Sequence, residues 1–600
     1  MGIKQKAEEK KMSMSKNIAR LAVTAGLTAA LSFGGVMAPV TMAFAAGTPV
    51  ATEKGNVAIE EDIYTNTTFK GIQIFKATVA QDKKDNTFNG PKTLSDIEWA
   101  SPNVENAVKG VFADAVDKPT NNATAQDWAD YITKKAGDNV GEGVKVDAGS
   151  TLDKIAKALE EVTTTNEDTG WKTSTDGKFN NLPAGYWLFV TAQAGSTKDA
   201  NKTNGNEDAF TSPIFTIVGG SDVNVTPKKD VPNVTKAVKD DAPNSAFGDF
   251  LNPNKAADSA MDDWVDYKLV GTVASNINTY STYTYTFTDT LPKSMTPKFK
   301  DGGTTPDVTV KIGGTEVKTG YTAKYENDTL TVDFTNLRDC KGEGDTAISL
   351  NGNSEVTVEY QAKLDSRKIF DKGKIKEEFK DFVGKAQINK VKLTYSNNPH
   401  DESTTGTTVE HPAYDYTYGI DVTKVGSDDK DKGLAGVEFT LQEKDDTNNF
   451  IKADGTKTKD NEQAKLKTDA SGKINVVGLD EGTYVLTEVK PAPGYNNSHS
   501  AGITFTITRG TLPADDTTVV NPGCTLATGT DGDLVKVAQT NTEAADGKVH
   551  LTVTDQKGSN LPLTGLNGVT FTWIAGGAVL CIGVAHLIRS RKQAEESEQE

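Results

Sequence analysis

Apolar and polar residues alternate with a period of two along much of the chain between residues 46 and 560. Clear examples are the runs 282–287 (TYTYTF), 356–360 (VTVEY) and 503–507 (ITFTI). Such alternation is typical of strands that bury one face, and turns rich in Gly, Asn and Asp separate the runs. The pattern therefore predicts a mainly β protein whose strands form antiparallel sandwiches.

Helical periodicity is concentrated near the start of this region. Apolar residues recur at helical spacing in the segments 104–116, 124–136 and 151–162. Residues three or four positions apart lie on one face of a helix, so each segment would bury one stripe. We therefore expect the first domain to be β with a helical insertion.

Two polar, turn-rich stretches divide the β region. The first contains Gly219-Gly220 and the run 227–232 (PKKDVP), and the second covers 395–418 and precedes a new strand. Stretches of this composition are typical of turns and linkers. No short-period repeat is present in the sequence, which argues against a solenoid. The predicted domains are 46–228, 229–415 and 416–560.

The N-terminus has the pattern of a secretion signal. Lys16 and Arg20 precede the apolar run 21–36, and Ala43-Phe44-Ala45 provides a small-x-small cleavage site. This order predicts a signal peptide over residues 1–45. A membrane anchor is the alternative, but the apolar run is short and glycine and proline interrupt it.

The C-terminus combines three features in a fixed order. The pentapeptide Leu561-Pro562-Leu563-Thr564-Gly565 is followed by an apolar stretch, 566–588, and by a tail, 589–600, that begins with three basic residues and ends acidic. The apolar stretch is long enough to span a bilayer, and the basic residues would hold its end in the cytoplasm. This order resembles the cell-wall sorting signal of Gram-positive surface proteins. The resemblance implies that a sortase attacks the Thr564 carbonyl, releases the chain from Gly565 onward and passes the acyl group to an amine. A plain single-pass anchor is the alternative.

Composition narrows the classes of protein further. The 600 residues carry a formal net charge of -18, which disfavours a nucleic-acid binder because such proteins present basic patches. Three cysteines are too few for a disulfide scaffold or a Cys-rich metal site, and Cys340 and Cys524 have no evident role. Five scattered histidines show no zinc-binding spacing, and no nucleophile–base pair or phosphate loop is apparent. We therefore expect neither an enzyme nor a protein that holds a metal or a cofactor.

The third predicted domain contains four segments that together form a recognisable pattern. They are VTKV at 422–425, GLAGVEFTL at 433–441, GTYVLTE at 482–488 and LTVTD at 551–555. They resemble the CnaB-type (inverse immunoglobulin) domains of Gram-positive adhesins and pilins. The resemblance implies that Lys424 forms an amide bond with Asp555, with Glu488 as the proton shuttle. Water would then be the leaving group, because the acceptor is Asp rather than Asn.

The chemistry of such a bond depends on burial. A lysine amine among apolar side chains has a lowered pKa, which makes the neutral nucleophile available. A carboxyl in the same dry pocket has a raised pKa, so it stays protonated and can donate to the acceptor carbonyl and move a proton. The fold supplies proximity by holding the amine and the carbonyl together. An ordinary ion pair between Lys424 and Glu488 at a sheet rim is the alternative.

The second predicted domain repeats this arrangement. It opens with Lys236 in VTKAV, carries Asp289 in YTFTDTLP and closes with Asn389 in INKVKLTYSNNP. These segments resemble the middle domain of SpaA-type backbone pilins, which implies Lys236 as nucleophile, Asp289 as shuttle and Asn389 as acceptor. Asn397 is the fallback acceptor and Lys239 a competing nucleophile. A set of ordinary surface polar residues is the alternative.

The first predicted domain ends in the run 223–228 (VNVTPK). This run resembles the pilin motif of sortase-polymerised pili, with Thr226 where tyrosine is usual. The proline before Lys228 fixes the backbone and removes a donor, which would present Lys228 at a domain edge. Lys229 is the rival, and a basic linker is the alternative. The predicted strand 185–190 (GYWLFV) lacks a carboxylate, so we expect no internal bond in this domain.

These resemblances imply three tandem immunoglobulin-like (CnaA/CnaB-type) β-sandwiches, the first with a helical insertion, followed by a transmembrane helix. They imply a backbone subunit of a sortase-assembled pilus, in which Thr564 of one subunit is joined to Lys228 of the next. The implied partners are pilus-class and housekeeping sortases, identical subunits and peptidoglycan, whereas minor or tip pilins and host surface ligands stay open. The implied location is the Gram-positive cell wall. A monomeric wall-anchored adhesin that binds a host matrix protein is the alternative, and only the pilin needs Lys228.

Overall fold

The computed structural model describes residues 48–558 with short gaps. The gaps are 60–63, 66, 85, 137–145, 164–169, 198–204, 228, 517–518, 520–523, 530–534 and 539–545. The predicted signal peptide, the pentapeptide 561–565, the predicted membrane helix 566–588 and the tail 589–600 lie outside the described residues. Among the residues that are described, no helix is long and apolar enough to cross a membrane.

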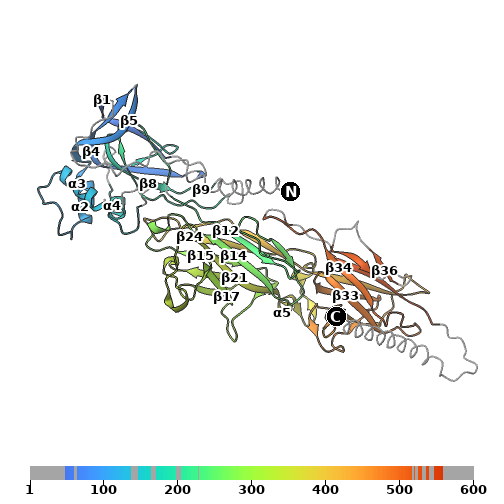
Figure 1. The fold of residues 1–600 in the computed structure, drawn as a ribbon. Helices are drawn as coiled ribbons and strands as arrows, with labels where there is room; N and C mark the ends of the chain where they lie inside the picture. The colour runs from blue at the N-terminus through green and yellow to red at the C-terminus, as the bar shows by residue number, and fades with distance from the viewer. Residues whose placement is uncertain are drawn as a thin grey trace, which may run out of the picture.

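The strands form successive groups of sheets along the chain (Figure 1). The first group comprises β1 (Thr48–Thr52), β2 (Lys54–Ile59), β3 (Tyr64–Thr65), β4 (Thr68–Lys84), β5 (Thr87–Trp99), β6 (Lys172–Thr173), β7 (Lys178–Pro183), β8 (Gly185–Gln193), β9 (Ser196–Thr197), β10 (Ile214–Val218) and β11 (Val223–Val225). The main sheet has the order β1-β4-β8-β10, and a smaller sheet has the order β11-β2-β7. Phe69, Phe179 and Trp187 belong to a buried cluster contributed by strands of both sheets. The prediction of a mainly β chain is confirmed.

In the described part of the chain between β5 and β6 lie three α-helices, which Figure 1 labels. They are α2 (Pro102–Val111), α3 (Ala125–Ala136) and α4 (Thr151–Glu160). The hydroxyls of Ser101 and Ser150 accept hydrogen bonds from the first turns of α2 and α4, which stabilises both helix starts. The prediction of a helix over 104–116 was too long, because the chain leaves helical geometry at Phe112 and Val116 is fully exposed. The expected helical insertion is confirmed.

The second group of strands forms two facing sheets and a separate pair, β22 with β23. Its strands are β12 (Val234–Lys239), β13 (Ala256–Asp258), β14 (Val265–Thr272), β15 (Tyr285–Thr290), β16 (Met295–Pro297), β17 (Val308–Ile312), β18 (Thr315–Glu316), β19 (Thr322–Glu326), β20 (Thr329–Phe334), β21 (Glu355–Leu364), β22 (Phe370–Asp371), β23 (Lys374–Ile375), β24 (Gln387–Ser396), β25 (Thr405–Thr407) and β26 (His411–Tyr416). One sheet has the order β12-β14-β21-β17-β18 and the other β13-β26-β24-β15-β20-β19. A large apolar cluster includes residues of both sheets. A short helix, α5 (Ser366–Ile369), follows β21.

The third group also forms two sheets. Its strands are β27 (Tyr418–Gly426), β28 (Glu438–Glu443), β29 (Phe450–Ile451), β30 (Lys457–Thr458), β31 (Leu466–Lys467), β32 (Lys473–Leu479), β33 (Gly482–Lys490), β34 (Ile503–Arg509), β35 (Cys524–Gly529), β36 (Val535–Ala538) and β37 (Lys548–Asp555). One sheet has the order β32-β27-β37-β36 and the other β30-β29-β28-β33-β34-β35. The first strand, β27, pairs in parallel with the last, β37. The two ends of this part of the chain therefore lie side by side.

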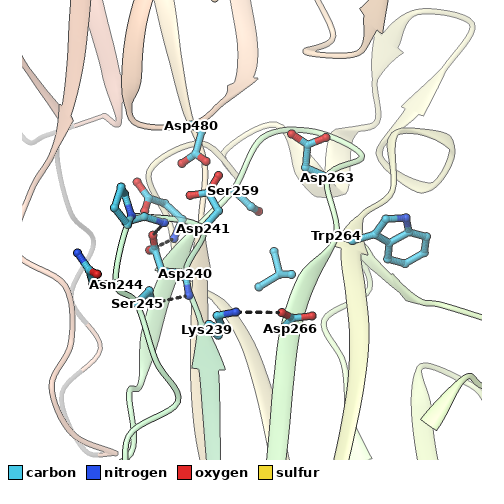
Figure 2. A pocket seen from close by; sticks show the side chains of 14 residues that line it. Lys239, Asp240, Asp241, Asn244, Ser245, Ser259, Asp263, Trp264, Asp266 and Asp480 are labelled. Atoms are coloured by element: carbon cyan, nitrogen blue, oxygen red, sulfur yellow. Dashed lines mark hydrogen bonds and ion pairs between the residues drawn. The ribbon is translucent and has the colours of Figure 1, made fainter. Parts of the chain in front are cut away.

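An acidic pocket lies where the second and third groups of strands meet (Figure 2). Asp240, Asp241 and Asp263 come from the loops around β12 to β14, and Asp480 comes from the turn before β33. Arg509 crosses this junction, since its guanidinium bonds to Asp240 and Asp258 on the other side. Burial raises the pKa of Asp258 to about 7, although Arg509 opposes the shift. This junction therefore depends on the charges of several crowded carboxyls.

Candidate sites of internal cross-linking

Lys236 is fully buried on β12. Tyr267 of β14 and Tyr360 of β21 lie against it. Their ring centroids are 5.2 and 5.4 Å, respectively, from the Lys236 Nζ. Burial among these groups lowers the pKa of Lys236 to about 8, against the opposing effect of Asp289. An amine with a lowered pKa supplies more of its neutral, nucleophilic form near neutral pH.

Asp289 and Asn389 face Lys236 from the opposite sheet. Asp289 lies on β15 opposite Val391 of β24, so Asn389 lies two residues away along β24 and on the same face. Both side chains are fully buried, and the Lys236 amine donates to Asp289. Burial raises the pKa of Asp289, although Lys236 opposes this rise. The structure thus brings the predicted lysine and the predicted shuttle into direct contact, with the predicted acceptor beside them.

Tyr360 joins these groups, and the sequence analysis gave it no role. Its hydroxyl donates to Asp289 and lies 3.0 Å from the Lys236 Nζ and 2.7 Å from the Asn389 Nδ2. Tyr360 shares the inward phase of the alternating run 356–360, where it counts simply as a core residue. Only its polar end distinguishes it, because a buried tyrosine hydroxyl usually has a hydrogen-bond partner.

Asn397 and Lys239, the alternatives for the middle-domain site, have partners outside that site. Asn397 is buried, but its amide donates to the backbone oxygen of Asp208 at a distance of 3.3 Å, in contact with the first group of strands. Lys239 has a side chain that is 44% exposed, and its nearest acidic partner is Asp266 at 3.9 Å. The geometry therefore favours Asn389 and Lys236 over these alternatives.

The second buried lysine site lies in the third group of strands. Lys424 of β27 is opposite Val553 of the parallel strand β37, and Asp555 follows two residues later on the same face. The Lys424 amine bonds to Asp555 and, at 2.9 Å, to the Oε2 atom of Glu488 on β33 in the facing sheet. All three side chains are buried. The three residues predicted from the sequence are thus in mutual reach.

The charge balance of this site favours one extra proton. Two carboxyls surround a single ammonium group, and burial raises the pKa of Glu488 to about 7, with Asp555 adding to the rise and Lys424 opposing it. One oxygen of Glu488 and one of Asp555 are buried without a partner among the described residues. A protonated Glu488 could donate a hydrogen bond, which an ionised carboxylate cannot.

His499 is a further neighbour that the sequence analysis did not assign. Its Nε2 lies 3.0 Å from the backbone oxygen of Thr554 and 4.0 Å from Asp555 Oδ1. Burial lowers the pKa of His499, which favours the neutral ring. The contact with the Thr554 oxygen then requires a proton on Nε2. His499 therefore holds the end of β37 in place through a backbone contact.

Of the residues considered for the linkage between subunits, the structure describes only Lys229. Lys228 and Thr564 lie outside the described residues. Lys229 is described, and its side chain is only 3% exposed because its amine bonds to the buried carboxylate of Asp208 at 2.5 Å. The hydroxyl of Thr67 bonds to the same carboxylate oxygen at 2.6 Å. Lys229 is therefore a poor candidate for an amine that must meet another protein.

Comparisons with known proteins agree with the resemblance seen in the sequence. Residues 419–521 match the family described as SpaA, a prealbumin-like fold domain. This match agrees with the expected resemblance to SpaA-type pilins, and it falls on the third predicted domain, for which the sequence predicted a CnaB-type fold. No curated protein matches the chain.

The chain is also similar to solved structures of pilins. It is 15% identical to the T6 backbone pilin of serotype M6 Streptococcus pyogenes, with 85% of this chain and 99% of that chain covered and a TM-score of 0.46. It is 14% identical to the full-length major pilin SpaD from Corynebacterium diphtheriae, with 84% and 98% covered and a TM-score of 0.42. The major pilin RrgB from Streptococcus pneumoniae is 15% identical, with 66% and 88% covered and a TM-score of 0.34.

Proposed function

We propose that this protein is the backbone subunit of a covalently polymerised surface pilus. The observation that carries the proposal is the pair of buried sites at Lys236 and Lys424, each holding an amine against a carboxyl beside an Asn or Asp acceptor. The SpaA domain match of residues 419–521 supports the same function. The protein acts as a structural subunit, since the chemistry proposed for it is a single formation of its own cross-links.

The subunits are joined head to tail by sortase. The acyl group of Thr564 in one subunit passes to the amine of Lys228 in the next, and the last subunit is transferred to peptidoglycan. The burial of Lys229 supports Lys228 as the acceptor, because an amine held by Asp208 has lost both its exposure and its freedom. The chain is exported, held by its membrane helix until sorting, and then bound to the cell wall.

The internal bonds join Lys236 to Asn389 and Lys424 to Asp555. In the middle domain ammonia leaves, and in the third domain water leaves. The three domains are immunoglobulin-like sandwiches of the CnaA and CnaB kinds, at about 46–228, 229–415 and 416–560. A covalent link between early and late strands keeps the second and third sandwiches from extending when the fibre is pulled, and it constrains the unfolded chain as a disulfide does.

The test of polymerisation is the pattern of surface protein on denaturing gels. Wild-type cells should show a ladder of high molecular weight, and Lys228→Ala should abolish it. Lys229→Ala should keep the ladder, because the Lys228 amine is still present. Ladders that persist in Lys228→Ala cells would overturn the assignment of Lys228. If ladders are absent even in the wild type, with the tail joined only to peptidoglycan, the protein is a monomeric wall-anchored adhesin.

A further inference from the structure

Tyr360 occupies the centre of the middle-domain site. Its hydroxyl contacts the nucleophile nitrogen of Lys236, the Nδ2 atom of Asn389 and a carboxylate oxygen of Asp289. A phenol offers one proton and two lone pairs. Donation to Asp289 and acceptance from the two nitrogens use all of this capacity, so the hydroxyl is held in place by every group that takes part in the reaction.

The proposed shuttle alone does not complete the proton path. Replacement of the Asn389 amide by the Lys236 amine requires a proton to reach Nδ2, because the nitrogen must leave as ammonia. Asp289 bonds to Lys236 and to Tyr360, and the described residues include no hydrogen bond between Asp289 and Asn389. Tyr360 fills this gap, since its oxygen is 2.7 Å from the leaving nitrogen.

We propose that Tyr360 is a catalytic residue of the middle-domain cross-link, and that it carries a proton from the attacking nitrogen to the leaving nitrogen. This inference rests on the proposed bond between Lys236 and Asn389. The distances of 3.0 and 2.7 Å to the two nitrogens lie within the range in which general acid–base catalysis operates.

The steps balance without any further reactant. The Lys236 ammonium first passes a proton to the Asp289 carboxylate, and the freed lone pair attacks the Asn389 Cγ while the carbonyl electron pair moves to Oδ1. Nζ then gives a second proton to the Tyr360 oxygen as the tyrosine proton passes to Nδ2. The Cγ–Nδ2 bond breaks, the carbonyl reforms and ammonia leaves. Asp289 ends protonated, in agreement with the raised pKa that burial gives it.

The third domain shows why this role is specific to the middle one. There the Glu488 carboxyl bonds to Lys424 at 2.9 Å, and one of its oxygens lies within 4.8 Å of an Asp555 oxygen, so one side chain lies near both the amine and the acceptor. In the middle domain Asp289 bonds to the amine and to Tyr360, and among the described residues it is the Tyr360 hydroxyl that bonds to Nδ2 of Asn389. The proton for the leaving nitrogen therefore comes through Tyr360.

Tyr267 provides a matched control on the neighbouring strand. Tyr267 is fully buried. Its ring stacks on that of Tyr360 with the centroids 5.4 Å apart, and it also lies against the Lys236 amine. Its hydroxyl, however, faces Met295 Sδ at 3.8 Å rather than the reacting atoms. Tyr267→Phe thus removes a buried hydroxyl from the same ring stack without touching the proposed proton path.

The experiment follows ammonia loss over time by intact mass in chains of residues 46–560 made by cell-free synthesis. Tyr360→Phe should form the Lys236–Asn389 bond about a hundredfold more slowly than the wild type, whereas Tyr267→Phe should keep the wild-type rate. The rate of water loss from the third domain serves as an internal reference rate in every sample. Peptide mapping assigns each loss to its residues.

Three outcomes would overturn the inference in distinguishable ways. An unchanged rate in Tyr360→Phe removes the role of Tyr360 and leaves the bond itself intact. A wild type that loses water but never ammonia removes the middle-domain bond and the role of Tyr360 with it. The Lys236→Ala background, in which no bond can form, reports on folding: if adding Tyr360→Phe there abolishes the cooperative melting transition of the middle domain, the hydroxyl acts through structure instead.

Discussion

The two buried lysine sites use similar groups in different positions. In the middle domain the lysine lies on one sheet, whereas the acceptor and the carboxyl lie on the facing sheet. In the third domain the lysine and the acceptor lie on adjacent parallel strands, and the carboxyl lies across the sandwich. The first bond would therefore tie two sheets together, and the second would tie the first and last strands of one sheet.

This difference in position changes the proton chemistry. In the third domain a single carboxyl, Glu488, bonds to the amine and lies within 4.8 Å of the acceptor carboxyl. In the middle domain the carboxyl and the acceptor share a sheet, and the Tyr360 hydroxyl bonds to both of them. The geometry of the partner strands, more than the identity of the lysine, therefore decides which further residue contacts the reacting atoms.

The largest expected effect comes from removing each lysine in turn. Lys236→Ala and Lys424→Ala should each lower the free energy of unfolding of their own domain, and with it the temperature of its thermal transition. The loss should be about 4–5 kcal/mol if the links act as disulfides that close loops of about 100 residues or more. Calorimetry of the chain 46–560 resolves the two transitions, with exposed Lys239→Ala as the control. Transitions that do not move would contradict covalent links at these sites.

Replacing the two proposed proton shuttles should strongly slow the formation of the bonds. Asp289→Asn and Glu488→Gln keep the shape of the side chain but remove the acid–base function, so each bond should form about 10²–10⁴ times more slowly. Intact mass should show ammonia retained in the first variant and water retained in the second, with the other domain unaffected. Normal loss in either variant would mean that the carboxyl only holds the lysine in place.

A smaller effect is expected from pH at the junction between the two domains. The pKa of Asp258 is about 7 in the folded protein and near its ordinary value of about 4 when unfolded, so the folded state binds more protons between these values. Its contribution to stability is therefore full at low pH and is lost as pH rises through about 7. Between pH 5 and 8 the loss should be at most about 2–3 kcal/mol.

The measurement is the melting temperature across this pH range. Asp258→Asn should flatten the dependence, because an amide does not titrate. Asp241, Asp415 and Asp480 also have raised pKa values through burial, so they act in the same direction and part of the dependence should persist. A protein that becomes more stable from pH 5 to pH 8 would contradict this account.

The smallest effect is expected from exchanging the acceptor. Asp555→Asn changes the leaving group of the third domain from water to ammonia but yields the same amide. The cross-linked variant should therefore have the same mass as the cross-linked wild type, with a stability within about 1 kcal/mol of it. A final mass that differs between them would show that Asp555 is not the acceptor.

The sequence located much of both sites through the resemblance of their segments to CnaB-type and SpaA-type domains, and the alternation of the strands then put the site residues on the buried faces. Lys424, Glu488 and Asp555 each occupy the inward phase of a recognisable strand, so a polar residue there stands out against apolar neighbours. Tyr360 does not stand out, since tyrosine is ordinary in a core and only the position of its oxygen gives it a role. The end of α2 was misplaced because the apolar pattern continues past the point where the backbone leaves the helix.

By itself the sequence determined which faces of the strands are buried and where helices interrupt them. These are local properties, fixed by side-chain periodicity. Only the tertiary structure decided that Lys236 meets Asp289 from a facing sheet, that Lys424 meets Asp555 from a neighbouring strand, and that Lys229 is held by Asp208. Such pairings depend on sheet order and register between residues far apart in the chain, and periodicity carries no information about either.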